Sequence, residues 1–498
     1  MSGALACVHN EAVTEGFTET FTAGLASYGP RPCLEFGGRW FSGDQITAYA
    51  GTVGELLRDA GVADNVPLGV VVRNRMPHAA AIIGSLAAAR PVVMIYSFQS
   101  AHAIARDIEH LDLAAVVADP EDWTDEVVAA AVRAGTAGVT LASEAALVTG
   151  HCARERACYT AALHILTSGT TGPPKRFAVD APVLEHTVFS VTGGQASPDD
   201  PPELVYWPLG GIGGVCQLVT GVYTGKRMLL HEKFSVQAWA HAVQTYELQR
   251  SGVQPAVVRM LLDADLDPAV LSSLQFIVCA SGPLDVETRD AFEKRYGIPV
   301  LTAYGATEFA GSVCAWTPDL YREFGAVKRA SSGRPLPGVD VRIMNPDSGT
   351  EVPAGCHGVL EAKIPLLGPE WIRTMDVASI DTDRFITLHG RADGAINRGG
   401  FKILPETVRQ VLLSHPAVRD ACVVGVPDER LGQVPFAAVE TCPGTSATEV
   451  DLKGLVRQEL PRHNVPVAIV LVDQLPRNPS LKVSLPAVAA LYPARSNS

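Results

Sequence analysis

The sequence predicts an α/β fold with a large N-terminal domain and a small α+β C-terminal domain. Its 498 residues exceed what one hydrophobic core normally serves, so at least two domains are expected. With 47% hydrophobic and 19% charged residues, the chain has the composition of a globular protein and not of a disordered one. Short apolar runs alternate with helical stretches, which is the order of βα units.

The predicted elements follow this alternation. Apolar runs at residues 69–72, 91–95 and 114–118 predict strands, and residues 77–90 predict the helix between the first two. After Asp393 a compact tail follows, with helices near residues 407–414 and 448–460 and strands at residues 421–426, 435–440 and 468–471. The expected domains are therefore residues 1–391 and residues 392–498.

Charge and hydropathy argue against several kinds of partner. The net charge is −13 and basic residues form no stripe, so neither nucleic acid nor an acidic membrane is expected to bind. The most apolar window, residues 78–96, is interrupted by Arg90, and short strands and helices explain it better than a membrane span. The N-terminus shows no basic-then-apolar signal pattern, and the ten cysteines form no C-x-x-C pair. A cytoplasmic protein with free thiols is expected, and a homodimer remains open.

One segment combines hydroxyls, glycines and a lysine in a pattern suited to phosphate. Backbone amides exposed by glycines and side-chain hydroxyls can donate to phosphate oxygens, while a lysine adds positive charge. The pattern is not a Walker loop, because two prolines precede the lysine and Arg176 follows it. A flexible polar turn is the plain alternative. The candidate ATP-binding residues are Thr167, Ser168, Gly169, Thr170, Thr171, Gly172 and Lys175.

This segment resembles the phosphate loop of the adenylate-forming superfamily, which includes acyl-CoA synthetases, peptide-synthetase adenylation domains and luciferases. The stretch from Tyr304 to Glu308 is similar to the family's second motif. The resemblance implies that Tyr304 stacks on adenine beside Gly305, that Thr307 lies near the α-phosphate, and that Glu308 holds Mg²⁺. A hard cation prefers carboxylate and phosphate oxygens together. The segment Ser281, Gly282 and Pro283 resembles the backbone that lines adenine.

The remaining motifs occur in the family's order. Asp376 resembles the aspartate that accepts both ribose hydroxyls, and Arg391 the arginine that reaches the nucleotide. Asp393 is similar to the hinge residue, and Gly399, Gly400 and Lys402 belong to a glycine-rich loop that resembles the wall of the coenzyme A tunnel. Lys482 resembles the terminal lysine that bridges the acyl carboxylate and the α-phosphate.

The resemblance implies a fold and a reaction. The fold is a large adenylate-forming domain, with two β/α subdomains and a distorted β-barrel, followed by a small mobile domain. The reaction uses ATP, Mg²⁺ and coenzyme A: a carboxylic acid becomes an acyl adenylate, and the thiol of coenzyme A then displaces AMP. Lys482, Thr307, Glu308 and Lys402 are the expected catalytic residues, and two orientations of the small domain serve the two steps.

Four departures from the family pattern bear on specificity. The family often places an aromatic residue and a histidine after Pro208-Leu209, whereas this chain has glycines. Either the acyl pocket is wide and suits a bulky, aryl or polycyclic acid, or the loop needs glycine for its backbone alone. The segment from Gly358 to Asp376 is short, and Met375 and Leu481 each replace a usual glycine. The expected acyl-pocket residues are Trp207, Gly210, Gly211, Gly213, Gly214 and Ala303.

These departures leave alternatives to a ligase of secondary metabolism that carries out both adenylation and thioester formation. Bulk at Met375 and Leu481 could weaken adenylation, so that the enzyme forms thioesters from an adenylate made elsewhere. Transfer to the phosphopantetheine of a carrier protein is a second alternative. A non-catalytic nucleotide or acyl sensor is the alternative from another class, and the retained Lys482 argues against it.

Overall fold

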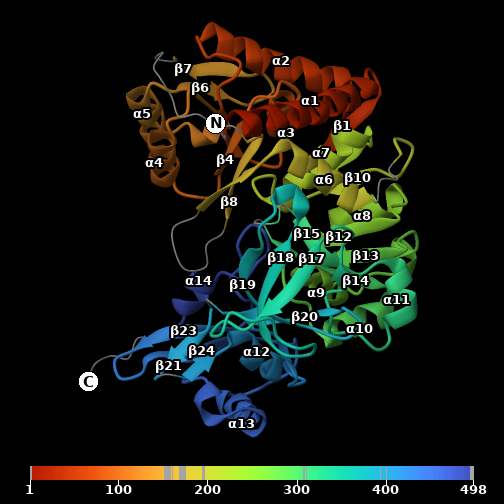
Figure 1. Cartoon of the computed structure of the whole chain (residues 1–498), viewed down its shortest axis with the longest axis vertical. Helices are drawn as coiled ribbons and strands as arrows, with labels where there is room; N and C mark the ends of the chain where they lie inside the picture. Colours follow the sequence, from red (N-terminus) through yellow and green to blue (C-terminus); the bar gives the residue numbers. More distant parts are fainter. Residues whose placement is uncertain are drawn as a thin grey trace.

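The computed structural model describes residues 3–150, 159, 161–167, 175–192, 197–306, 309, 311–392, 394–399 and 401–493, without the side chains of residues 3–15, 166–167, 175, 189–192 and 402. Within these residues, a large N-terminal part lies at the top of Figure 1 and a small C-terminal part, in blue, at the bottom. The predicted mixed α/β class is confirmed.

A seven-stranded sheet organises the beginning of the chain. Its order is β7-β6-β5-β3-β4-β8-β9, with a parallel centre and an antiparallel pair at each edge. The central strands are runs of buried apolar residues, as expected when helices cover both faces. Helices α1, α2 and α3 cover one face, and α4 and α5 the other (Figure 1). The strands are β3 (Leu68–Val72), β4 (Val92–Tyr96), β5 (Ala115–Ala118), β6 (Ala137–Thr140), β7 (Ala146–Thr149), β8 (Leu163–Thr167) and β9 (Lys175–Val179), and the helices are α1 (Gly3–Tyr28), α2 (Gly43–Asp59), α3 (Met76–Ala87), α4 (Ala101–Leu111) and α5 (Asp125–Ala134).

Two further sheets build the middle of the large part. A four-stranded sheet has the order β10-β11-β1-β2, and a five-stranded sheet has the order β12-β13-β14-β15-β16. Trp239 of α8, Val257 of α9 and Phe292 of α10 belong to the core beside the five-stranded sheet. The strands are β1 (Pro32–Phe36), β2 (Arg39–Ser42), β10 (Glu203–Val205), β11 (Met228–Leu230), β12 (Arg250–Val253), β13 (Phe276–Cys279), β14 (Val300–Ala306), β15 (Gly311–Ala315) and β16 (Arg334–Pro335), and the helices are α6 (Ala181–Thr192), α7 (Ile212–Thr224), α8 (Val236–Thr245), α9 (Pro255–Asp263), α10 (Val286–Tyr296) and α11 (Pro318–Phe324).

A four-stranded antiparallel sheet ends the large part, where the family resemblance implied a distorted β-barrel. Its order is β17-β18-β19-β20, and among the described residues it is an open sheet with no pair that closes it. A barrel would require the first and last strands to pair. The strands are β17 (Asp340–Met344), β18 (Gly358–Lys363), β19 (Ile372–Ile380) and β20 (Ile386–Arg391).

The small C-terminal part is an α+β unit with its own apolar core, as expected from the sequence. Its sheet has the order β22-β21-β24-β23, and β25 pairs with β24 in parallel. The predicted helices and strands are present, with ends shifted by a few residues. They are β21 (Ile396–Arg398), β22 (Phe401–Ile403), α12 (Pro405–Leu413), β23 (Val418–Asp428), β24 (Gly432–Thr441), α13 (Glu449–Glu459), β25 (Ala468–Val472) and α14 (Leu485–Ala489).

Two features of the chain bear on its environment. No helix in the described part of the chain combines the length and the apolar character that crossing a bilayer requires. The seven cysteines whose side chains the structure describes are free thiols, five of them buried.

Candidate functional site

The adenine-lining and adenine-stacking candidates lie at one edge of the five-stranded sheet. Strands β12, β13 and β14 are parallel, with Cys279 of β13 opposite Thr302 of β14. Ser281 follows the end of β13, and Tyr304 and Gly305 lie at the end of β14, so all three share the carboxyl edge of the parallel strands. Ligands of open α/β sheets bind at this edge. Ser281 is exposed and adopts a left-handed backbone, with φ of 73°.

Two of the predicted nucleotide residues contact the carboxylate of a third, Asp376. The Tyr304 hydroxyl donates a hydrogen bond to Asp376 Oδ2 at 2.5 Å, and Arg391 Nη1 lies 3.5 Å from Asp376 Oδ1. Asp376 of β19 and Arg391 of β20 are paired residues of neighbouring strands. The contact between β14 and β19 therefore joins the adenine-stacking candidate to the ribose-binding candidate.

The same contact fixes the protonation state of Tyr304. Burial and the neighbouring Asp376 carboxylate raise the pKa of the Tyr304 hydroxyl far above its ordinary value. Tyr304 therefore keeps its proton and acts as a donor to Asp376 at any physiological pH. Gly305 has a separate, steric role, because an added Cβ would lie 2.1 Å from the Gly311 carbonyl oxygen of β15. Only glycine fits this close approach.

The phosphate loop connects two paired strands. Thr167 ends β8, Lys175 begins β9, and the two residues are opposite each other in an antiparallel ladder. The predicted residues Ser168, Gly169, Thr170, Thr171 and Gly172 lie between them and fall outside the described residues, as do Thr307 and Glu308. Among the described residues there is no group of three or more His, Cys, Asp or Glu side chains that could hold a metal ion.

The space beside most glycines of the expected acyl pocket, in the loop from Gly210 to Gly214, is occupied by neighbouring residues. An added Cβ would lie 2.8 Å from Val72 at Gly210, 2.3 Å from the Trp207 ring at Gly213, and 2.4 Å from the Pro208 carbonyl oxygen at Gly214. None of these glycines has a positive φ, so the requirement is close approach and not a special backbone. At three of the four glycines, neighbouring protein atoms occupy the space that a side chain would need. These glycines therefore give no support to a widened pocket.

Gly211 is the exception, because its added Cβ would meet nothing closer than 3.6 Å. The loop is held by Asn74, whose side-chain amide donates to the Trp207 carbonyl at 2.9 Å and accepts from the Leu209 amide at 2.9 Å. Sequence reasoning missed Asn74. Its only sequence signal is a polar residue shortly after the apolar strand β3. Ala303, the last acyl-pocket candidate, is a half-buried residue of β14.

The two residues that stand where the family usually has glycine, Met375 and Leu481, direct their side chains to different surroundings. Met375 is 43% exposed and precedes Asp376 in β19, so the two side chains point to opposite faces of the strand. Leu481 adopts φ of 60°, the left-handed conformation that favours glycine and costs another residue about 1–2 kcal/mol. Its side chain packs against the apolar core of α8, α9 and α10 in the large part.

Lys482 lies in a tight hairpin closed by a bridge between Arg477 and Val483. Asn478 holds the turn, since its backbone amide donates to the Lys482 carbonyl at 2.8 Å and its side chain accepts from the Lys482 amide at 3.0 Å. The Lys482 side chain is exposed. Docking of the adjacent Leu481 on the large part brings the hairpin against the domain that carries the nucleotide candidates.

The glycine-rich loop of the expected coenzyme A tunnel joins β21 to β22. Gly399 has φ of 55°, and its amide donates to the Leu431 carbonyl at 2.8 Å. Lys402 belongs to β22, although its side chain is outside the described atoms; Gly400 and Asp393 are outside the described residues altogether. The exposed ring of Phe401 stacks on His463, with centroids 4.5 Å apart.

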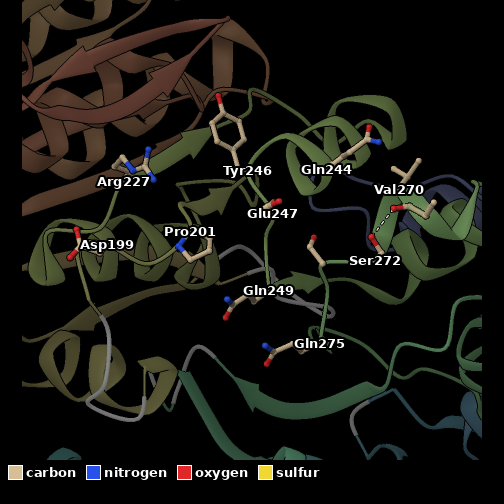
Figure 2. A pocket seen from close by; sticks show the side chains of 12 residues that line it. Asp199, Pro201, Arg227, Gln244, Tyr246, Glu247, Gln249, Val270, Ser272 and Gln275 are labelled. Carbon is tan, nitrogen blue, oxygen red and sulfur yellow. Dashed lines mark hydrogen bonds between the residues drawn. The ribbon is translucent and has the colours of Figure 1, made fainter.

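A separate polar hollow of about 690 Å³ lies on the large part, beside α8 and β12 (Figure 2). Arg227, Gln244, Gln249 and Gln275 are among its lining residues, and it contains none of the predicted site residues. It has no part in the site described above.

Known proteins share both domains of the chain. The model of the AMP-binding enzyme family matches residues 21–368, and the model of the AMP-binding enzyme C-terminal domain matches residues 408–482. The 2-succinylbenzoate–CoA ligase of Bacillus licheniformis is 30% identical over 341 residues, which are 65% of this chain and 68% of that protein. The corresponding ligase of Bacillus subtilis is 29% identical over 335 residues, covering 64% and 66%.

Solved structures share the fold. ATP-bound MatB from Rhodopseudomonas palustris has a TM-score of 0.81 at 21% identity, covering 95% of this chain and 98% of that one. The o-succinylbenzoate CoA synthetase of Bacillus subtilis, in complex with the acyl-adenylate intermediate OSB-AMP, has a TM-score of 0.77 at 23% identity, covering 96% and 98%. The resemblance seen in the sequence motifs is confirmed, and so is the prediction of an enzyme. The chain belongs to the AMP-binding enzyme family.

Proposed function

We propose that the protein is an AMP-forming acyl-CoA ligase that activates an aryl carboxylic acid. The observation that carries the proposal is the convergence of Tyr304, Arg391 and the paired Asp376 at the carboxyl edge of β14, since this arrangement suits an adenosine. The substrate class is supported by the 2-succinylbenzoate–CoA ligases among its relatives. Tyr96 lies against Gly210 and stacks on Phe98 with centroids 4.6 Å apart, and this pair offers aromatic surface for an aryl group.

In the first step, an oxygen of the acid attacks the α-phosphorus of ATP. A bond forms between that oxygen and phosphorus, and the bond to the β-phosphate oxygen breaks, so that pyrophosphate leaves. The Tyr304 ring lies against adenine and Asp376 accepts from the ribose hydroxyls. The loop from Thr167 to Lys175 holds the departing phosphates, while Lys482 and Thr307 stabilise the charge on the α-phosphoryl oxygens.

In the second step, the thiol sulfur of coenzyme A attacks the carbonyl carbon of the adenylate. The bond from that carbon to the phosphate oxygen breaks, AMP leaves, and the thiol proton is lost to solvent. We place the pivot at Asp393, with domains 1–391 and 392–498, so that Gly399, Gly400 and Lys402 replace Lys482 at the site. Glu308 is the proposed Mg²⁺ ligand; one carboxylate with phosphate oxygens and waters is a normal Mg²⁺ environment.

The experiment combines the protein with Mg²⁺, ATP and coenzyme A, together with a panel of acids that includes 2-succinylbenzoate, other aryl acids and short aliphatic acids. Synthetic aryl acyl adenylates are supplied in parallel, and mass spectrometry measures adenylate and thioester. Thioester from a free aryl acid is the expected result. Thioester from the adenylate alone would reduce the function to the second step, and adenylate without thioester would favour a carrier-protein acceptor. Neither product with any acid would reject the proposal.

A further inference from the structure

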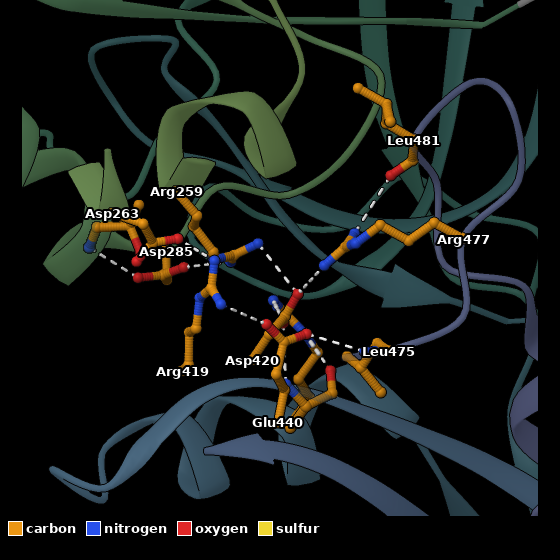
Figure 3. Close-up of polar contacts among 12 residues, drawn as sticks. Arg259, Asp263, Asp285, Arg419, Asp420, Glu440, Leu475, Arg477 and Leu481 are labelled. Atoms are coloured by element: carbon orange, nitrogen blue, oxygen red, sulfur yellow. Dashed lines mark hydrogen bonds and ion pairs between the residues drawn. The ribbon is translucent and has the colours of Figure 1, made fainter. Parts of the chain in front are cut away.

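Two pairs of opposite charges join α9 of the large part to β23 of the small part (Figure 3). Arg259 Nη1 donates to Asp420 Oδ2 at 3.2 Å, and Arg419 forms an ion pair with Asp263. Arg259 and Asp263 are one helical turn apart on α9, whereas Arg419 and Asp420 are adjacent in β23. Each element presents one positive and one negative charge. A shift of one element along the other would therefore place charges of the same sign next to each other.

The Arg259–Asp420 pair is deeply buried at the contact between the two parts. The Arg259 side chain is 8% exposed and that of Asp420 is 3% exposed. At such burial the pair is weakly screened by salt and its geometry is well defined. The second pair lies nearer the solvent, with the Asp263 side chain 42% exposed.

Each member of the buried pair has another partner within its own domain. Arg259 Nη2 donates to Asp285 at 2.7 Å, and Asp420 accepts from Arg409 at 2.8 Å and from Arg477 at 2.6 Å. If the small part moves away, Arg259 keeps Asp285, and Asp420 keeps its two arginines. Separation therefore leaves no unpaired buried charge, which is what usually makes breaking a buried ion pair so unfavourable.

The pair also lies on a continuous path between the two predicted halves of the site. On one side, Asp285 caps α10 through the Thr288 amide at 2.8 Å and follows the adenine-lining segment after Ser281 by a few residues. On the other side, Arg477 Nη1 donates to the Leu481 carbonyl at 3.2 Å, within the hairpin that presents Lys482.

We propose that the Arg259–Asp420 pair, supported by Asp263 and Arg419, is a docking key that holds the small domain in the orientation that presents Lys482 to the nucleotide. The proposal rests on the proposed two-step function. Arg259 and Asp420 are positioning residues: they act through Arg477 and the hairpin and touch no substrate. Breaking the pair from the large side favours other orientations of the small domain, which weakens the lysine-dependent first step and spares the thiol-dependent second step.

The test variant is Arg259→Gln, which leaves the partners of Asp420 in the small part intact. Arg259→Gln combined with Asp263→Asn removes both α9 charges, and Arg259→Lys is the conservative variant. Arg295→Gln is the matched control, because it also removes an arginine from an ion pair, but the partner, Asp265, lies within the large part.

Domain orientation is measured without reference to activity. Spin labels on the exposed Cys356 of the large part and the half-buried Cys442 of the small part give an interdomain distance distribution, with Cys7, Cys152 and Cys158 replaced by serine. The ligand-free parent and Arg295→Gln should show one dominant distance. Arg259→Gln should add a second population, and the double variant should enlarge it.

The two half-reactions are measured on the same variants, with pyrophosphate exchange for the first step and thioester formation from a synthetic aryl adenylate for the second. For Arg259→Gln we expect exchange to fall by about five- to thirty-fold, as a coupling of ordinary size would give, while thioester formation is unchanged or faster. Arg259→Lys should recover most of the exchange. An unchanged distance distribution rejects the docking key, and so does an equal loss of both half-reactions. A parent that is inactive in both assays contradicts the proposed function, whereas its distances still test the key.

Discussion

The Tyr304 hydroxyl donates its hydrogen bond to Asp376, which ties the residue expected to stack on adenine to the residue expected to bind ribose. The two residues come from β14 and β19, in different sheets of the large part. Their contact orients the carboxylate before any nucleotide arrives. A preorganised acceptor loses less freedom on binding.

Tyr304→Phe should therefore weaken ATP binding and leave the chemical step nearly intact. The ring remains to stack on adenine, while Asp376 loses its buried donor, a loss of about 1 kcal/mol or about fivefold in affinity. The expected result is a KM for ATP raised by about fivefold with kcat within about twofold. A kcat loss at unchanged KM would contradict the orienting role. Because the pKa of Tyr304 is strongly raised, the parent enzyme should show no activity change from this group below about pH 10.

Met375→Thr should have no effect on adenylation beyond about twofold, because the Met375 side chain is exposed on the opposite face of β19 from Asp376. Threonine keeps the strand propensity that glycine would lose. Asp376→Asn in the same strand is the comparison and should weaken ATP binding by about tenfold or more. Pyrophosphate exchange measures both variants. A marked rise in exchange for Met375→Thr would mean that its bulk does limit the first step.

Gly213→Ala and Gly211→Ala form a matched pair in the glycine loop. The added methyl at position 213 would lie 2.3 Å from Trp207, whereas the one at position 211 would meet nothing closer than 3.6 Å. Overpacking at Gly213 should destabilise the protein by about 1–3 kcal/mol and displace the indole. At Gly211, the N-cap of α7, the loss should stay below about 1 kcal/mol. Urea unfolding and tryptophan fluorescence measure the stabilities of the two variants. Equal effects would show that the packing around Gly213 can relax to accept a methyl group.

Asp420→Asn should reveal a pH-dependent contribution to stability. Burial would raise the pKa of Asp420, but Arg259 and Arg409 outweigh it and hold the pKa at about 2. In the unfolded chain the pKa of Asp is about 3.9, so the carboxylate stabilises the fold above about pH 4, by about 2–3 kcal/mol, and this contribution is lost as the pH falls toward 2.

The measurement compares the free energies of unfolding of the parent and of Asp420→Asn from about pH 3 to about pH 8. The difference should be constant at neutral pH and shrink by about half at the acid end. A difference that persists undiminished in acid would show that Asp420 acts by shape and not by charge.

The sequence predicted the mixed α/β class and several of the elements, and the resemblance supplied candidate site residues that the structure can place. The short apolar runs of β3 and β5 are buried throughout, and this continuous burial of a central strand is what makes such a run recognisable in a sequence. Tyr304, Asp376 and Arg391 were assigned to one nucleotide by resemblance, and the structure brings these three together.

Other features depend on contacts that a sequence does not display. The glycines near Trp207 left a wide pocket as one of two interpretations, yet packed neighbours fill three of the four positions, and those of Gly210 come from the distant strands β3 and β4. Arg259 and Asp420 are 161 residues apart, and no local pattern distinguishes either from a surface charge. The left-handed backbone of Leu481 likewise runs against its local preference and is offset by its packing on the large part.

The most direct test of the central claim follows one oxygen atom. An accepted aryl acid labelled with ¹⁸O in its carboxylate is incubated with the protein, ATP and coenzyme A, and the products are resolved by mass spectrometry. An acyl adenylate pathway transfers one labelled oxygen to AMP and leaves pyrophosphate unlabelled. Formation of ADP, with the label in inorganic phosphate, would show an acyl phosphate pathway and contradict the account.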